Sequence, residues 1–118
     1  MPSRNTSRIV ATIAYNIELA HRFIDGLSFE VFETDERAVY AVTRCLEIIS
    51  EASRRLPIDL KSRHPTVPWE KIAGAGNVYR HDYEDVLARI IWDTVRDHLG
   101  VLAEAMRVEM SNVERSDE

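Results

Sequence analysis

Apolar residues recur at intervals of three and four along residues 5–25. The repeat consists of Ile9, Ile13, Ile17, Ala20 and Ile24. Because an α-helix turns once about every 3.6 residues, this spacing places the apolar side chains on one face, which is typical of a helix that buries a single stripe. Gly26 follows the last of these positions and predicts the end of the helix.

A second long helix is predicted to begin after Thr34 and Asp35, whose side-chain oxygens can cap its first turn. The apolar positions that follow again repeat at three and four: Val39, Val42, Leu46 and Ile49. Pro57 ends this helix because proline lacks the backbone donor. Residues 28–32, which include two phenylalanines, are expected to form a turn or a short helix that closes over the core.

Residues 56–68 contain three prolines and are predicted to form one long connection. Pro68 suits the first position of the next helix, where a missing N–H costs nothing. That helix is expected to run from Trp69 to about Tyr83. Gly74 and Gly76 each weaken it by up to about 1 kcal/mol relative to alanine, so a break or a late start is one of its expected features.

The last predicted helix, residues 85–110, carries two apolar stripes. The main seam consists of Trp92, Val95, Leu99, Leu102 and Met106, and the second of Leu87, Ile91, Val101, Ala105 and Val108. A homodimer interface is the favoured use of the second stripe. The alternative is a central helix that its own chain wraps.

These patterns together predict an all-α protein with a single domain over residues 1–118. We expect a four- to five-helix up-down bundle, which is homodimeric, with an ordered core of about residues 5–110 and a frayed tail at 111–118. The length fits one hydrophobic core rather than two.

The composition indicates the cellular compartment of the protein and bears on whether it binds nucleic acid. No apolar run approaches the roughly 20 residues that span a bilayer, the N-terminus lacks the apolar core of a secretory signal, and Cys45 has no partner for a disulfide. A reducing cytoplasm is therefore expected. The net charge of −5 argues against a strongly electrostatic nucleic-acid binder, but bases outnumber acids within residues 54–71: Arg54, Arg55, Lys61, Arg63 and Lys71 against Asp59 and Glu70.

The sequence lacks the motifs of several common kinds of catalytic or binding site. The sequence has no phosphate-binding loop, no dinucleotide fingerprint, no serine-hydrolase elbow and no cysteine pair, so no cofactor and no structural zinc are predicted. His81 and Asp85 stand one helical turn apart, but two ligands at helical spacing do not make a metal site.

The one segment with concentrated chemistry is Arg80-His81-Asp82-Tyr83, which combines a cation, a proton carrier, an acid and a phenol. The other histidines stand in long helices (His21 and His98) or in the proline-rich connection (His64). Without further information, the segment is better interpreted as a polar helix end than as a site.

Segments spread over nearly the whole chain resemble the HepT-like group of HEPN proteins. They are FEVF (29–32) with Asp35, LEIISEA (46–52), HP (64–65), PWEKIAG (68–74), NVYRHDY (77–83) and IWDTV (91–95). The resemblance implies a dimeric helical bundle that acts as a ribonuclease toxin. It also implies a partner, a minimal nucleotidyltransferase encoded beside it, that neutralises the toxin.

The family motif is Arg-x-x-x-x-His-x-Tyr. His81 matches its histidine, Tyr83 its tyrosine, and Asn77 the asparagine that usually follows the arginine. The arginine position holds Gly76, which has no side chain to contact a phosphate. Glu51 also matches a family position, and Asp82, which stands between His81 and Tyr83, is a further supporting candidate.

Metal-free RNA cleavage needs a base for the ribose 2′-hydroxyl and a cation for the anionic phosphorane. The resemblance assigns the first role to His81, and Arg80 is the candidate cation, with Arg44 or Arg54 as substitutes if either reaches the cleft. Tyr83 is the expected acceptor of AMP from the partner. The alternative is a non-catalytic dimer that binds the nucleotidyltransferase or a nucleotide, because the motif arginine is replaced by Gly76.

Overall fold

The computed structural model describes the backbone of residues 3–81 and 84–116, and the side chains within these ranges except at 77–86 and 114–116. Its elements are α1 (Arg4–Ile24), α2 (Phe29–Thr34), α3 (Glu36–Arg54), α4 (Ile58–Ser62), α5 (Trp69–His81), α6 (Glu84–Asp93), the π-helical turn η1 (Thr94–His98) and α7 (Leu99–Ser116). Within the described ranges every regular element is a helix, which confirms the predicted all-α class.

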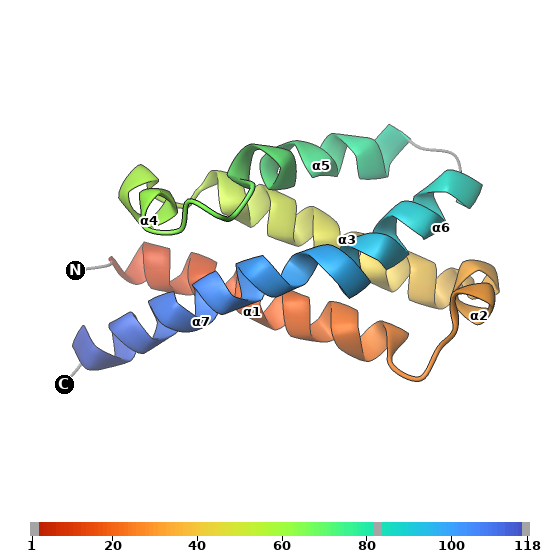
Figure 1. The fold of residues 1–118 in the computed structure, drawn as a ribbon, viewed down its shortest axis with the longest axis horizontal. Helices are drawn as coiled ribbons and strands as arrows, with labels where there is room; N and C mark the ends of the chain where they lie inside the picture. Colours follow the sequence, from red (N-terminus) through yellow and green to blue (C-terminus); the bar gives the residue numbers. More distant parts are fainter. Residues whose placement is uncertain (1–2, 82–83, 117–118) are drawn as a thin grey trace.

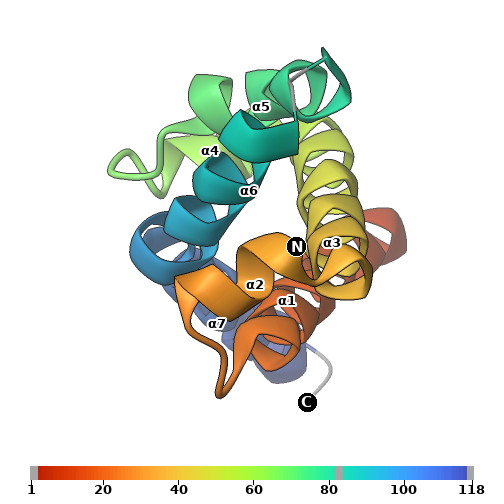
Figure 2. The same cartoon turned by 90° about the vertical axis from the view of Figure 1, so that its right-hand side faces the viewer.

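The long helices run alternately up and down the long axis of the molecule (Figure 1). α1 leads away from the N-terminus, α3 returns beside it, α5 runs out again, and α6, η1 and α7 return as one nearly continuous rod. α3 packs against both α1 and α5, and α7 packs against α1. Viewed end-on, α2 lies across the end of the bundle at which α1 leads into α3 (Figure 2).

Side-chain caps set the starts of the first three helices. Ser3 accepts a hydrogen bond from the Thr6 N–H at 3.1 Å, and Ser28 accepts one from the Val31 N–H at 3.2 Å. Asp35 accepts one from the Ala38 N–H at 3.1 Å and begins α3, as predicted. Gly26 has φ 77°, a left-handed conformation that glycine adopts without strain, and the chain leaves α1 there.

Residues 28–32 begin a genuine helix, α2, rather than a turn. Phe32 on α2 is fully buried, and its ring centroid lies 5.2 Å from that of Trp92 on α6. Phe29 meets the same indole edge-on at 5.9 Å. These aromatic contacts, rather than helix propensity, fix the short segment against the core.

The prolines of residues 56–68 do not keep this segment irregular, because α4 forms within it. Leu60 in α4 is 1% exposed and Val67 after it is 4% exposed, so apolar burial holds the connection. The Trp69 indole N–H donates to the carbonyls of Lys61 and His64. Pro68 precedes α5 instead of occupying its first position, and its carbonyl accepts the Ile72 N–H at 3.1 Å.

The main apolar seam of the last predicted helix is buried as expected, from Trp92 to Met106. The helix is not uniform, however, because η1 interrupts it at Thr94–His98 and α7 continues to Ser116, beyond the predicted end near residue 110. Ile91 and Ala105 of the second stripe are buried within this chain, whereas Val101 is 47% exposed. The chain thus covers part of the second stripe itself, as the wrapped-helix alternative predicts. None of the described helices combines the length and apolar character needed to cross a bilayer.

Candidate functional site

Three of the predicted site residues, Asn77, Arg80 and His81, lie on the last turns of α5. α5 is helical through Gly74 and Gly76, so the glycines do not break it. Asp82 and Tyr83 lie outside the described residues. The position of α5 therefore determines where the candidate residues at its end lie. The contacts between α5 and the rest of the bundle fix this position.

Ser50 on α3 holds α5 through two main-chain groups. Its hydroxyl donates to the Ala73 carbonyl at 3.0 Å and accepts the Gly76 N–H at 3.2 Å. Ser50 is 2% exposed, so these bonds form in a site shielded from water, where an unpaired hydroxyl would be costly. One side chain thus fixes the middle of α5 against α3.

Gly76 is the close-approach point of this contact. A Cβ atom at position 76 would lie 3.0 Å from the Ser50 hydroxyl oxygen and 3.5 Å from its Cβ. This contact is tighter than ordinary van der Waals packing, so a side chain there would require the Ser50 hydroxyl to shift by a few tenths of an ångström. At Gly74, by contrast, a Cβ would meet nothing within 4 Å. At the arginine position of the motif, this chain therefore has a close interhelical contact between Gly76 and Ser50.

Arg54, one turn after Ser50 on α3, reaches the same carbonyl of α5. Its Nε and Nη2 donate to the Ala73 oxygen at 3.0 and 2.6 Å. Its Nη1 lies 3.7 Å from a carboxylate oxygen of Glu51, and the two side chains are 43% and 59% exposed. Glu51, a predicted supporting residue, thus faces Arg54 at the surface, and Arg44 is exposed elsewhere on α3.

A cleft of about 390 Å³ opens beside α5, between α5 and the rod of α6 and η1. Its walls include the apolar residues Leu46, Ile49, Ile72 and Ala75, with Lys71, Thr94 and His98 also lining it. The Thr94 hydroxyl donates to the Ile90 carbonyl at 2.7 Å, within the stretch where the helix widens into η1. The face of α5 that leads toward His81 is thus partly open.

Among the residues whose side chains are described, a dense group of charges lies between the connection after α4 and α7. Glu109 of α7 accepts from Arg63 at 2.8 Å and contacts the His64 Nε2 at 2.6 Å. Its side chain is 4% exposed and that of His64 is 14% exposed. Burial alone would raise the pKa of the Glu109 carboxyl, but the hydrogen bonds from Arg63 and His64 outweigh it and lower this pKa.

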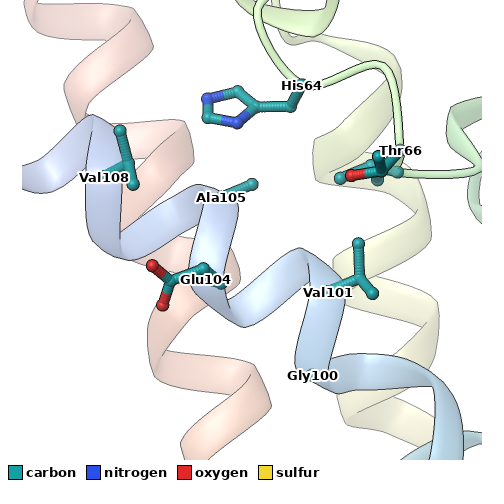
Figure 3. Close-up of a pocket in the computed structure, with 8 residues that line it drawn as sticks. His64, Thr66, Gly100, Val101, Glu104, Ala105 and Val108 are labelled. Atoms are coloured by element: carbon teal, nitrogen blue, oxygen red, sulfur yellow. The ribbon is translucent and has the colours of Figure 1, made fainter.

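A shallow cavity of about 360 Å³ adjoins this group, with His64 and Thr66 on one side and residues of α7 on the other. Figure 3 shows the His64 ring above Ala105 and Val108, and the Glu104 carboxylate turned away from the ring. Glu104 is paired with Arg107 at 2.6 Å. The cavity thus offers His64 alone as a titratable group facing inward, and that group already contacts Glu109.

Two further candidates carry little chemistry. Among the described residues, no three His, Cys, Asp or Glu side chains gather as a metal site would require, and the side chains of the His81 and Asp85 pair lie outside the described set. Cys45 is buried, and this burial raises the pKa of its thiol. A buried thiol of raised pKa is a poor nucleophile.

Sequence reasoning missed the residues that actually hold α5. Ser50 and Arg54 are one turn apart on α3, and their partners Ala73 and Gly76 are small residues on one face of α5. A polar pair at this spacing opposite a small-residue pair is the signal that predicts such a contact. It is a weak signal, because many helices carry both features without meeting.

Comparison with known proteins finds a family and relatives that are named as ribonucleases. Residues 13–109 match the HepT-like family, described as "Ribonuclease HepT-like". A "Probable ribonuclease HepT" of Thermococcus cleftensis is 40% identical over 87 residues, which cover 74% of this chain and 79% of the relative. A Methanocaldococcus jannaschii protein named "Putative RNase" is 26% identical over 118 residues, covering 100% of this chain and 98% of the relative. No solved structure matches the chain.

Proposed function

Because this chain belongs to the HepT-like ribonuclease family, we propose that it cleaves RNA without a metal ion, with His81 as the catalytic residue. The observation that carries the proposal is the extent of the family match, which spans residues 13–109 and so includes all of α5. His81 lies inside this span at the end of α5, and it is the residue there suited to move protons near neutral pH.

The chemistry follows from the 2′-hydroxyl of RNA. His81 draws the proton from this hydroxyl, the oxygen attacks the adjacent phosphorus, and the 5′-oxygen of the next nucleotide leaves with a proton. The products are a 2′,3′-cyclic phosphate and a free 5′-hydroxyl. In a homodimer of HEPN-type bundles, the His81 of each copy would serve as base and as acid across one cleft. Val101 and Met110 on α7, 47% and 39% exposed, are apolar side chains that a second copy of the chain would cover.

Arg80 is the proposed cation for the phosphorane. It follows Gly76 by four residues on α5, which is about one helical turn, or roughly 6 Å along the axis. This position in the sequence suits a substitute for the motif arginine, whose place Gly76 takes in this chain. Asn77 and Asp82 are the proposed supporting residues, by their nearness to His81 in the sequence.

We further propose that this protein is the toxin of a type VII-like toxin–antitoxin pair. A cognate minimal nucleotidyltransferase would transfer AMP from ATP to the Tyr83 hydroxyl, two residues after His81. A bulky anionic adduct two residues from His81 would block access of RNA to His81 and would repel the RNA phosphates. It would therefore stop cleavage.

The test is incubation of the purified protein with total cellular RNA in the presence of a metal chelator. Discrete fragments that end in cyclic phosphate, and that are absent with His81→Ala, would support the proposal. A folded Arg80→Ala protein is expected to lose on the order of 2 kcal/mol of transition-state stabilisation. An unchanged rate in this variant would remove Arg80 from the mechanism.

The second candidate is a non-catalytic dimer that binds the nucleotidyltransferase or a nucleotide. The packing of Gly76 against Ser50 favours it, since the motif arginine has been given up for an interhelical contact. Intact RNA with both the wild type and His81→Ala, together with formation of a complex with the nucleotidyltransferase, would select this function.

A further inference from the structure

Arg54 presents one edge of its guanidinium to the protein and the other to solvent. The inner edge, Nε and Nη2, donates to the Ala73 carbonyl of α5. The outer edge, formed by Nη1 and the second N–H of Nη2, meets only the Glu51 carboxylate within the described residues, at 3.7 Å. This outer pair of donors has the fork geometry that matches two oxygens of a phosphate.

The anchoring makes this arginine unlike an ordinary surface charge. A free arginine loses much rotamer entropy when it binds a ligand, whereas the bonds to Ala73 have already fixed the Arg54 side chain. Its pairing with Glu51 is long and solvent-exposed, and such pairs contribute little. A phosphate can therefore displace Glu51 at small cost.

The position of Arg54 relates it to His81. The Ala73 carbonyl points along α5 toward its C-terminus, and His81 lies eight residues after Ala73 on this helix. The rise between the two residues is about 12 Å. This separation is too long for Arg54 to touch the phosphate attacked at His81, but a short stretch of single strand can span it.

The charged residues around Arg54 include further bases that could contact RNA phosphates. Arg63, which belongs to the same basic stretch of sequence, is tied to Glu109, but Arg54, Arg55 and Lys71 are exposed. α3 and α5 pack side by side (Figure 1), so these bases belong to neighbouring helices. Glu51 and Glu70 are exposed on the same two helices, so the three bases exceed these acids by one.

We propose that Arg54 is an RNA-binding residue, which holds a phosphate of single-stranded RNA on the strand that leads to His81. This inference rests on the proposed ribonuclease function and deepens it, since it assigns a substrate contact that lies away from the reacting phosphate. Arg54 acts on substrate binding, so its loss raises KM and leaves the rate of a saturated enzyme nearly unchanged.

The test is equilibrium binding of a fluorescently labelled single-stranded RNA to the non-cleaving His81→Ala protein over a series of salt concentrations. Replacing Arg54 with alanine in this background is expected to weaken binding by about tenfold at low salt. It should also reduce the slope of log K against log salt by about 0.7, the contribution of one phosphate contact in a single strand.

Three further variants separate phosphate binding from a structural role. Arg54→Gln keeps a donor for the Ala73 carbonyl without the charge, and it should lose the same salt slope. Ser50→Ala removes the other side chain that holds Ala73 but no charge, so it should lower stability and leave the slope unchanged. Arg55→Ala removes a neighbouring exposed charge and should change the slope much less than Arg54→Gln does.

Equal salt slopes of RNA binding for the His81→Ala protein with Arg54 and with Arg54→Gln would overturn the inference. An absence of RNA binding by the folded His81→Ala protein would also overturn it. The outcomes also distinguish this inference from the proposed function. Cleavage that is unaffected by Arg54→Gln would leave the ribonuclease standing without this contact. RNA binding that depends on Arg54, in a protein that does not cleave RNA, would support the Arg54 contact and contradict the proposed ribonuclease function.

Discussion

Two polar contacts tie distant segments of this protein together, and they differ in how completely they are closed. Where the connection after α4 meets α7, Glu109 is 3% exposed and is held by both Arg63 and His64. Between α3 and α5, Arg54 is 43% exposed and only one edge of its guanidinium is used. The closed group satisfies its charges internally, whereas the open one retains donors for a ligand. Among the described side chains, the closed group is therefore assigned a structural role, and the half-open contact is the one expected to take part in substrate binding.

The largest expected effect separates the two histidines. His81→Ala should reduce RNA cleavage by at least about 100-fold with little change in the free energy of unfolding. His64→Ala should leave the cleavage rate of folded protein unchanged but lower stability by about 1–3 kcal/mol, because Glu109 loses a hydrogen bond in a buried site. Initial rates and urea unfolding of both variants measure this. Equal effects of the two substitutions on cleavage would erase the distinction.

A second comparison uses two glutamates of α7. Glu109→Gln replaces the buried acceptor of Arg63 and is expected to cost about 1–3 kcal/mol of stability. Glu104→Gln, at the exposed pair with Arg107, should change it by less than about 1 kcal/mol. Chemical unfolding gives both values. If the two variants were equally stable, the closed contact would not be what holds the connection to α7.

The pH dependence of stability should reveal the same carboxylate. The pKa of Glu109 is lowered on folding, so its contribution is present above the unfolded pKa of about 4.3 and is lost as the pH falls through the folded value. The stability difference between wild type and Glu109→Gln should therefore shrink as the pH is lowered from neutral into this acidic range. A difference that is constant with pH would show that the Glu109 charge is not involved.

The smallest expected effect concerns the two glycines of α5. Gly74→Ala should stabilise the protein by about 0.5–1 kcal/mol, since alanine favours the helix and its Cβ meets nothing. Gly76→Ala should bring no such gain, because the added Cβ would lie 3.0 Å from the Ser50 hydroxyl oxygen and would strain its two hydrogen bonds. Thermal unfolding of the two variants, and of Ser50→Gly with Gly76→Ala, tests this. An equal gain from both glycine substitutions would remove the steric reason for Gly76.

The elements that the sequence predicted correctly are those with local causes. The stripe from Ile9 to Ile24 and the Asp35 cap each depend on residues within a few positions, and both helices formed as expected. α4 was missed because the burial of Leu60, rather than a local signal, stabilises it among prolines. The π-helical turn η1 was missed because the apolar repeat of the last helix continues through it at the usual spacing, without an insertion that would indicate a wider turn.

The candidate site shows the same division. The family motif located His81 and Tyr83 along the chain, and α5 carries His81 where a helix was predicted. The contacts of Ser50 and Arg54 with α5 join residues 19 to 26 positions apart, and no short pattern encodes such distances. His64, interpreted as a loop residue, proved to contact Glu109, which lies 45 positions away.

The central claim is that cleavage proceeds by attack of the neighbouring 2′-hydroxyl. The most direct measurement uses a synthetic RNA that contains one mapped cleavage position, beside the same RNA with a single 2′-deoxy nucleotide on the 5′ side of that bond. The account predicts that the protein, in the presence of a chelator, cuts the first RNA and leaves the substituted bond intact. Cleavage of both RNAs at this position would contradict it, because water rather than the ribose would then be the nucleophile.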